Sequence, residues 1–230
     1  MINIDQLGFD FGYTHKTARH PAKCTDALMP VMIGALKNNH RILDPFSGTG
    51  KIFLLRHWLP MSKIMAVEIE PEWAKISAGS IIGDAVYLPF PNGYFDAICT
   101  SPTYGNRMAD TLIDKYQEDR RTYACRLGKP LSKNNSGAMQ WGSKYREFHI
   151  LAWSESRRVL RPGGRFVLNI KDHVRDGKIQ LVTDWHIQVL KSIGFTIIEH
   201  HKIECSGVEW GKNSDKKIAF ESVIIMDLSS

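Results

Sequence analysis

The sequence lacks the features that would assign it to a membrane, secreted or metal-binding class. No apolar run approaches the ~18 residues that a membrane-spanning helix needs, and no basic start followed by an apolar core indicates a signal peptide. The four cysteines are far apart and form no CxxC pair, which argues against a zinc ribbon or a disulfide framework and favours a reducing, cytoplasmic compartment. The nine histidines include no HExxH motif, so no metal site is expected.

Positive charge is concentrated in one part of the chain. The net charge is +6 over 230 residues, of which 43% are hydrophobic, enough for one domain with a substantial core. Residues 105–146 hold nine Lys or Arg and four Asp or Glu, so nine minus four, or five, of the excess charges lie there. Clustered Lys and Arg indicate a polyanion partner, and a solvated loop is the alternative.

Segments with strand character alternate with segments of helical spacing. Strands are expected at residues 42–43, 63–70, 94–101, 165–170, 196–204 and 217–228, and helices at 22–37, 51–59, 71–80, 144–160 and 182–195. The sequence RPGG at 161–164 is expected to end the fourth of these helices. This alternation predicts a doubly wound α/β sheet, in which ligands bind at the carboxyl ends of the strands near the reversal of strand order.

Three polar features follow or precede the expected strands. The sequence DPFSGTG at 44–50 is a Gly-rich turn between a strand and a helix, but it matches neither the P-loop nor the GxGxxG pattern. Glu68 ends the second strand roughly 20 residues later, the spacing at which an acid bonds a ribose diol. Asp84 precedes the third strand, where a side-chain acceptor can bond an exocyclic amine such as adenine N6. Together these features favour a nucleoside-containing cofactor.

These segments resemble the class I S-adenosylmethionine-dependent methyltransferases and, within them, the amino-methylating DNA methyltransferases. DPFSGTG resembles the cofactor loop of that family, SPTYGNR at 101–107 resembles its [DNS]-P-P-[YFW] catalytic motif, and HPAK at 20–23 resembles the segment at the methionine end of the cofactor. RPGGRFVLNI resembles a helix–turn–strand unit of the later half. The resemblance, over about residues 20–200, implies a Rossmann-like seven-stranded sheet in a single domain, 1–230, with 105–146 as a candidate target-recognition insertion.

The resemblance also implies which residues bind S-adenosyl-L-methionine. The backbone of 44–50 cradles the cofactor, Glu68 holds its ribose and Asp84 its adenine. The implied cofactor-binding residues are His20, Pro21, Lys23, Asp44, Pro45, Phe46, Ser47, Gly48, Gly50, Glu68 and Asp84.

The implied catalytic residues are Ser101, Pro102 and Tyr104. An exocyclic amine on a base is a poor nucleophile, because its lone pair is delocalised into the ring. Acceptors at its protons, here the Ser101 side chain and the Pro102 carbonyl, free that lone pair, while Tyr104 stacks on the extruded base. No covalent nucleophile is needed, and Cys99 is expected to pack inside its strand.

The sequence departs from the family pattern at two positions. Thr103 stands where the catalytic motif usually has a second proline, and Cys24 stands where related HPxxKP segments have a proline. Ser101 at the first motif position resembles the cytosine-N4 branch, so the expected activity is site-specific methylation of cytosine N4 in double-stranded DNA, as in restriction–modification. The alternatives are adenine-N6 methylation of DNA, amino-methylation of tRNA or rRNA, a small-molecule methyltransferase, and a non-catalytic nucleic-acid-binding protein with this fold.

The basic segment supplies the expected contacts to DNA. Lys and Arg hold phosphates, whereas Asn, Gln and Arg read base edges. The candidate residues are Arg107, Arg120, Arg121, Arg126, Lys129, Asn134, Asn135, Gln140 and Lys144, with a second basic loop at 211–217. For Trp141, packing under the loop and a place in the recognition surface are equally supported.

Overall fold

A seven-stranded, mostly parallel sheet organises the chain. The computed structural model describes residues 26–77, 79–109, 122–205 and 218–230. The strand order is β3-β2-β1-β4-β5-β9-β8, and only β9 runs antiparallel to its neighbours. The strands are β1 Arg41–Asp44, β2 Lys63–Glu68, β3 Ser80–Ile82, β4 Phe95–Thr100, β5 Leu160–Ile170, β8 Phe195–Glu204 and β9 Phe220–Leu228, and a separate hairpin joins β6 His173–Arg175 to β7 Lys178–Gln180. This architecture confirms the predicted α/β fold.

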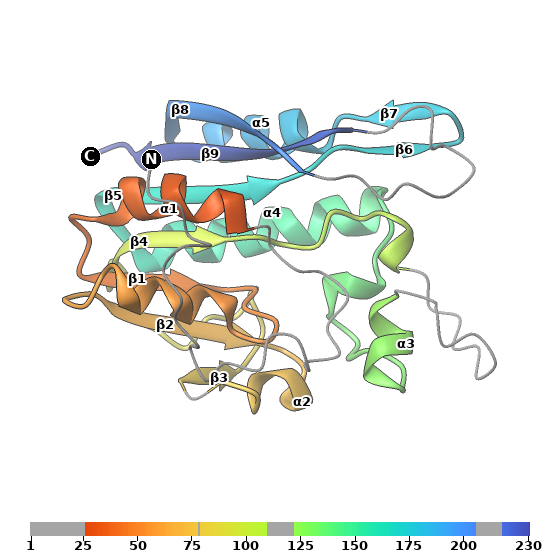
Figure 1. The fold of residues 1–230 in the computed structure, drawn as a ribbon, viewed down its shortest axis with the longest axis horizontal. Coiled ribbons are helices and arrows are strands. Elements are labelled where there is room, and N and C mark those ends of the chain that lie inside the picture. The colour runs from red at the N-terminus through yellow and green to blue at the C-terminus, as the bar shows by residue number, and fades with distance from the viewer. Residues whose placement is uncertain (1–25, 78, 110–121, 206–217) are drawn as a thin grey trace.

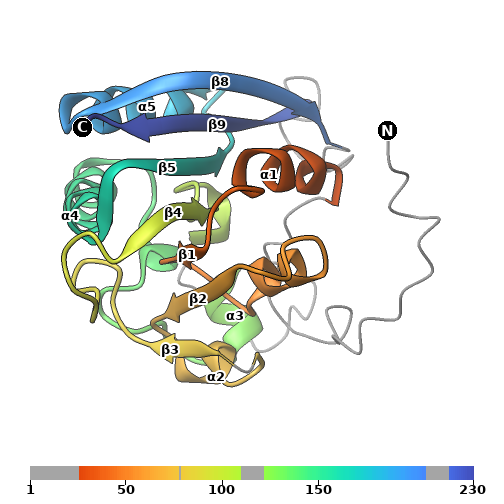
Figure 2. The same cartoon turned by 90° about the vertical axis from the view of Figure 1, so that its left-hand side faces the viewer.

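Helices cover both faces of the sheet. They are α1 Met29–Leu36, α2 Pro71–Ala74, α3 Tyr123–Leu127, α4 Ser143–Val159 and α5 Val182–Ser192, with the 3₁₀ segments η2 Asp26–Leu28, η3 Lys51–His57, η4 Arg107–Ala109 and η5 Ser136–Ala138. Figure 1 shows α1 in front of the sheet and α4 and α5 behind it, and Figure 2 shows the same layers from the side. The sheet is therefore buried on both faces, as parallel sheets require.

Alternation along the central strands divides the core between these two faces. In β4, Ala97 and Cys99 pack with residues of α1 and η3, whereas Ile98 packs with residues of α4 and α5. In β5, Val167 packs on the same face as Ala97 and Cys99, whereas Phe166 packs on the same face as Ile98. Because successive side chains of a strand point to opposite faces, these apolar runs specify a doubly covered sheet. The buried position of Cys99 agrees with its expected role in packing.

Some boundaries differ from the sequence expectation. The helix expected to end at RPGG does end just before it, at Val159, but β5 already begins at Leu160, which pairs with Phe95, so RPGG itself lies within the strand. The register shifts between Phe95 and Ala97, and Gly163 has a φ of 66°, a left-handed conformation that glycine adopts without strain. The segment after the Gly-rich loop forms a 3₁₀ helix. The β6–β7 hairpin was not predicted.

Polar side chains from several strands meet at one edge of the sheet. Glu68 ends β2, Asp44 ends β1 and Ser101 directly follows β4. Asn169 lies one residue before the end of β5, and Glu221 is the second residue of the antiparallel β9, which begins where β5 ends. This edge faces right in Figure 1, where α3 and the β6–β7 hairpin also lie. It contains the reversal of strand order between β1 and β4, the expected ligand site.

Candidate active site

Asp44 connects the Gly-rich loop to the strand that carries Ser101. Its Oδ1 accepts hydrogen bonds from the Phe46 amide at 3.0 Å and from the Thr100 hydroxyl at 2.7 Å. Burial raises the pKa of the Asp44 carboxyl to about 6, against the lowering effect of these two bonds. The Thr100 bond crosses from β4 to β1 and so fixes the two strand ends where the strand order reverses.

Glu68 braces the Gly-rich loop from β2. Its Oε2 accepts from the Gly48 amide at 2.8 Å, and its Oε1 accepts from the Glu70 amide at 2.9 Å. Burial raises the pKa of the Glu68 carboxyl to about 7, although these bonds lower it. Gly50 has a φ of 81°, and a Cβ there would lie 1.9 Å from Ser77 Oγ, so only glycine fits.

Asp84 accepts hydrogen bonds from a residue that was expected to contact DNA. Its Oδ1 accepts from the Val86 amide at 3.1 Å, and its Oδ2 accepts from Asn134 Nδ2 at 2.8 Å. The segment around Asn134 therefore lies against the candidate adenine position.

Glu70, which the sequence did not single out, holds that segment in place. It is fully buried and accepts from the Ser132 amide at 2.7 Å, the Ser132 hydroxyl at 3.1 Å and Asn135 Nδ2 at 2.7 Å. The Asn135 amide is thus turned inward and caps Gly137 with its Oδ1. No local pattern distinguishes Glu70 from the other acids of EIEPE, because its partners lie more than sixty residues away.

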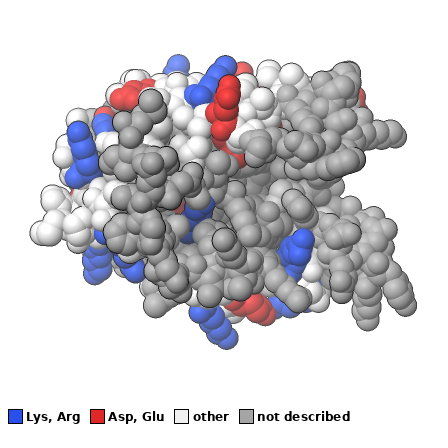
Figure 3. Space-filling view, viewed as in Figure 1, with Lys and Arg blue, Asp and Glu red and all other residues white. Residues whose placement is uncertain are grey.

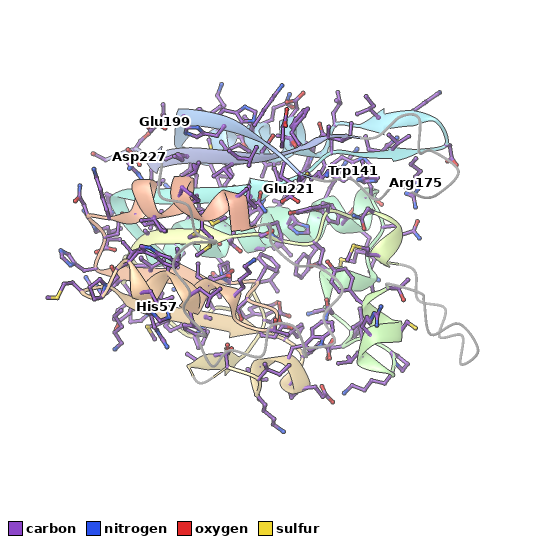
Figure 4. All side chains as sticks on the ribbon, in the orientation of Figure 1. His57, Trp141, Arg175, Glu199, Glu221 and Asp227 are labelled. Carbon is purple, nitrogen blue, oxygen red and sulfur yellow. The ribbon has the colours of Figure 1, made fainter. Side chains whose placement is uncertain are left out.

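Ser101 and Tyr104 belong to a cluster with two side chains that sequence analysis missed. The Ser101 hydroxyl lies 3.1 Å from the Tyr104 hydroxyl. Asn169 Nδ2, whose two hydrogens are shared among three acceptors, lies 3.2 Å from the Ser101 hydroxyl, 3.1 Å from the Tyr104 hydroxyl and 2.9 Å from Glu221 Oε2. The Tyr104 hydroxyl donates to Glu221 Oε2 at 3.3 Å. Figure 4 shows Glu221 near the carboxyl end of β5. Pro102, which follows Ser101 in the chain, is buried.

Two hydrogen bonds hold Thr103 where related motifs have proline. Its hydroxyl donates to Ser136 Oγ at 2.9 Å, and its carbonyl accepts from the Tyr145 hydroxyl at 2.6 Å. Residues 101–104 are thereby tied to η5 and to α4.

The Tyr145 bond is continued by a buried histidine. Since the single hydroxyl proton of Tyr145 goes to the Thr103 carbonyl, His186 Nε2, 2.9 Å away, must be the donor to Tyr145. His186 Nδ1 then accepts from Trp153 Nε1 at 2.9 Å, which agrees with this tautomer. Burial lowers the pKa of His186 well below its ordinary value, so the ring is neutral.

The other expected contact residues have varied positions. Gln140 and Lys144 are exposed, Arg126 is half-buried, and Lys129 is exposed and paired with Glu72. On the face in Figure 3, described Lys and Arg side chains are interspersed with acids. The expectations for His20, Pro21, Lys23, Cys24, Arg120, Arg121, the Arg107 side chain and the loop at 211–217 lie outside the described residues.

Trp141 combines packing with a basic neighbour. The half-buried Trp141 ring packs on Tyr145 and Trp185, and the Arg146 guanidinium lies 4.5 Å from its centroid. Its carbonyl accepts from Arg175 of the β6–β7 hairpin, and the two residues lie together in Figure 4. Trp141 therefore packs against the core and also contacts the basic side chains of Arg146 and Arg175.

Within the described residues, no helix is long and apolar enough to cross a membrane. No group of three or more His, Cys, Asp or Glu side chains in those residues could hold a metal ion.

Solved structures share this fold at low sequence identity. A protein from Pyrococcus horikoshii matches with a TM-score of 0.55 at 15% identity, over 96% of this chain and 100% of that one. A SAM-dependent methyltransferase from Methanosarcina mazei matches with a TM-score of 0.54 at 15% identity, over 87% and 97%. The 1,6-didemethyltoxoflavin-N1-methyltransferase of Burkholderia thailandensis, solved with 1,6-didemethyltoxoflavin and S-adenosylhomocysteine, matches with a TM-score of 0.52 at 13% identity, over 95% and 81%. No protein-family model and no curated protein sequence matches the chain. These likenesses establish the fold.

Proposed function

We propose that this chain transfers a methyl group from S-adenosyl-L-methionine to an exocyclic amine of a base in double-stranded DNA, with cytosine N4 as the favoured target. The observation that carries the proposal is the position of Ser101. It directly follows β4, beside the Thr100–Asp44 bond that joins this strand to the Gly-rich loop. A hydrogen-bond acceptor for an amine therefore lies next to the candidate cofactor loop.

The residues of the loop fit this cofactor. Among the described residues, Ser47 Oγ is buried without a hydrogen-bond partner, which is unusual unless a ligand supplies one. The raised pKa of Glu68 indicates a carboxylate that donors such as a ribose diol would stabilise. Two structural neighbours are named as methyltransferases, one solved with S-adenosylhomocysteine. When bound, the cofactor supplies an activated methyl group, so the chain needs no covalent nucleophile.

The residues at the end of β4 have separate roles in this proposal. Ser101 Oγ and the Pro102 carbonyl accept the two protons of the target amine and free its lone pair. Tyr104 stacks on the extruded base. The bonds of Thr103 to Ser136 and Tyr145 keep the segment in place and thus replace the rigidity of a second proline.

Exposed basic and amide side chains support nucleic acid as the substrate. Gln140 and Lys144 are exposed near the amino end of α4, in a segment whose Trp141 amide bonds the Gly105 carbonyl behind the catalytic motif. Serine at the first motif position favours cytosine over adenine. A small-molecule amine is the second candidate, because the Burkholderia neighbour is named as an N-methyltransferase of such a compound.

The test is transfer of a tritiated methyl group from S-adenosyl-L-methionine to unmethylated genomic DNA and to total RNA, followed by nucleoside mass spectrometry. The expected product is N4-methylcytosine in DNA, lost in Ser101→Ala. N6-methyladenine as the product would support amino-methylation of DNA but show that adenine, not cytosine, is the target base. Label in RNA alone would overturn the proposal that DNA is the substrate. Absence of transfer to either polymer, with cofactor binding intact by calorimetry, would favour a small-molecule substrate or a non-catalytic role.

A further inference from the structure

We propose that Glu221 and Asn169 orient the Ser101 hydroxyl so that its oxygen, and not its hydrogen, faces the substrate. The methyl acceptor would then have to be a hydrogen-bond donor, such as the N–H of an exocyclic amine. This inference rests on the proposed function, because it takes Ser101 as the neighbour of the methylated amine. Sequence analysis singled out neither residue: Asn169 lies in RPGGRFVLNI, where it was given no role of its own, and Glu221 lies in an expected strand. Both act through Ser101 as positioning residues.

The direction of the hydrogen bonds follows from the chemistry of Glu221. An ionised carboxylate accepts hydrogen bonds and donates none. The Tyr104 hydroxyl donates its single hydrogen to Glu221 Oε2. The 3.1 Å contact between the Tyr104 and Ser101 hydroxyls therefore requires Ser101 to be the donor. The chain of bonds runs from Ser101 through Tyr104 to the carboxylate, and a chain that ends on a charge polarises each bond in it.

The Ser101 oxygen is then left as an acceptor. Its hydrogen is directed at Tyr104, so two lone pairs remain. Asn169 Nδ2 donates to one of them at 3.2 Å. The other remains for a group that enters beside this half-buried side chain. An amine N–H finds an acceptor there, whereas a ring nitrogen or a carboxylate oxygen meets a lone pair and is repelled.

Burial indicates that Asn169 has a role beyond packing. Its side chain is fully buried in β5, and its Oδ1 has no hydrogen-bond partner among the described residues. An apolar side chain would avoid the cost of that unsatisfied oxygen. The amide is useful here because its Nδ2 reaches Ser101, Tyr104 and Glu221 at once. Glu221 is held beside it because β9 begins next to the end of β5.

The kinetic test uses Glu221→Gln, whose amide can donate to Tyr104 and so allow the chain of bonds to reverse. We expect kcat for DNA methylation to fall about 10- to 100-fold, with KM and the urea midpoint unchanged. Tyr104→Phe removes the hydroxyl that connects Ser101 to Glu221. In that background Glu221→Gln should lower kcat less than about twofold further. Full additivity of the two effects would overturn the inference. The matched control is Glu199→Gln, an exposed glutamate on β8, which should leave kcat unchanged.

A second measurement does not depend on activity. Neutron diffraction from crystals of the deuterated protein locates the hydroxyl deuterium atoms directly. We expect the Ser101 deuterium to point at Tyr104 and the Tyr104 deuterium to point at Glu221. A Ser101 deuterium directed away from Tyr104 would overturn the inference even in an active enzyme. A wild-type protein that methylates nothing would instead overturn the proposed function, and the deuterium positions would still decide how Ser101 is oriented.

Discussion

The Tyr145 hydroxyl donates a 2.6 Å hydrogen bond to the Thr103 carbonyl, which joins the segment 101–104 to the first turn of α4. Forty-two residues separate the two in sequence. His186 Nε2 hydrogen-bonds to the Tyr145 hydroxyl, and Trp153 Nε1 donates to His186 Nδ1. The position of Thr103 therefore depends on three fully buried side chains that are bonded to one another.

Removal of the Tyr145 hydroxyl should destabilise the fold. Tyr145→Phe leaves the Thr103 carbonyl and His186 Nε2 without this partner, which costs about 1–3 kcal/mol. The measurement is the free energy of unfolding in urea, with Tyr87→Phe as control, since Tyr87 is 76% exposed. Equal losses in the two variants would show that the Tyr145 bond contributes nothing specific.

Gly105 is expected to tolerate no side chain, for two separable reasons. Its φ is 64°, and a Cβ there would lie 2.9 Å from the Trp141 amide nitrogen. Gly128 has a φ of 78° with nothing within 4 Å of a Cβ, so Gly128→Ala measures the backbone strain alone, about 1–2 kcal/mol. Gly105→Ala should lose about 1–3 kcal/mol more because of the clash. Urea unfolding of both variants tests this, and similar losses would contradict the close approach of Trp141.

The buried Glu68 carboxyl should make stability depend on pH. Its pKa is raised from 4.5 to about 7, so the folded state holds the proton more tightly than the unfolded state does. The stabilisation from the protonated form is complete below pH 4.5 and is lost as the pH rises through 7, by about 3 kcal/mol. Asp44 acts in the same direction between pH 3.8 and about 6.

Glu68→Gln separates this contribution from that of Asp44, because glutamine does not titrate. Between pH 5 and pH 8 the wild type should lose about 2.5 kcal/mol relative to this variant, most of the full effect. Urea unfolding of both proteins at the two pH values provides the comparison. A difference between them that is independent of pH would rule out titration of Glu68 in this range.

Asn134 and Asp84 should affect cofactor binding in opposite ways. If adenine N6 bonds Asp84, Asp84→Ala should weaken the affinity for S-adenosylhomocysteine about 10- to 100-fold, because a charge-assisted hydrogen bond is lost. Asn134→Ala removes the amide that now bonds Asp84 Oδ2 and should leave the affinity equal or higher. Calorimetric titration of both variants is the measurement. Weaker binding in Asn134→Ala would mean that Asn134 contacts the cofactor itself.

Most of the sheet, and the row of motifs at its carboxyl end, could be predicted from the sequence, although β3 falls next to a segment expected to be helical. Apolar runs such as the one that forms β4 are typical of strands buried between two helical layers. The helical segments between successive strands are long enough to return the chain to the start of a parallel neighbour. Parallel strands bring their carboxyl ends to one edge, so the sequence predicts that Asp44, Glu68 and Ser101 lie together.

The tertiary structure alone decided which partners surround those residues. Glu221 reaches Tyr104 from 117 residues away because an antiparallel strand begins where β5 ends. Asn135 turns inward because Glu70 is buried beneath it, so the composition of a basic loop did not reveal which of its amides face solvent. Local patterns fix the burial and direction of a strand. They do not fix hydrogen bonds between distant side chains, which exist only once packing has brought the strands into register.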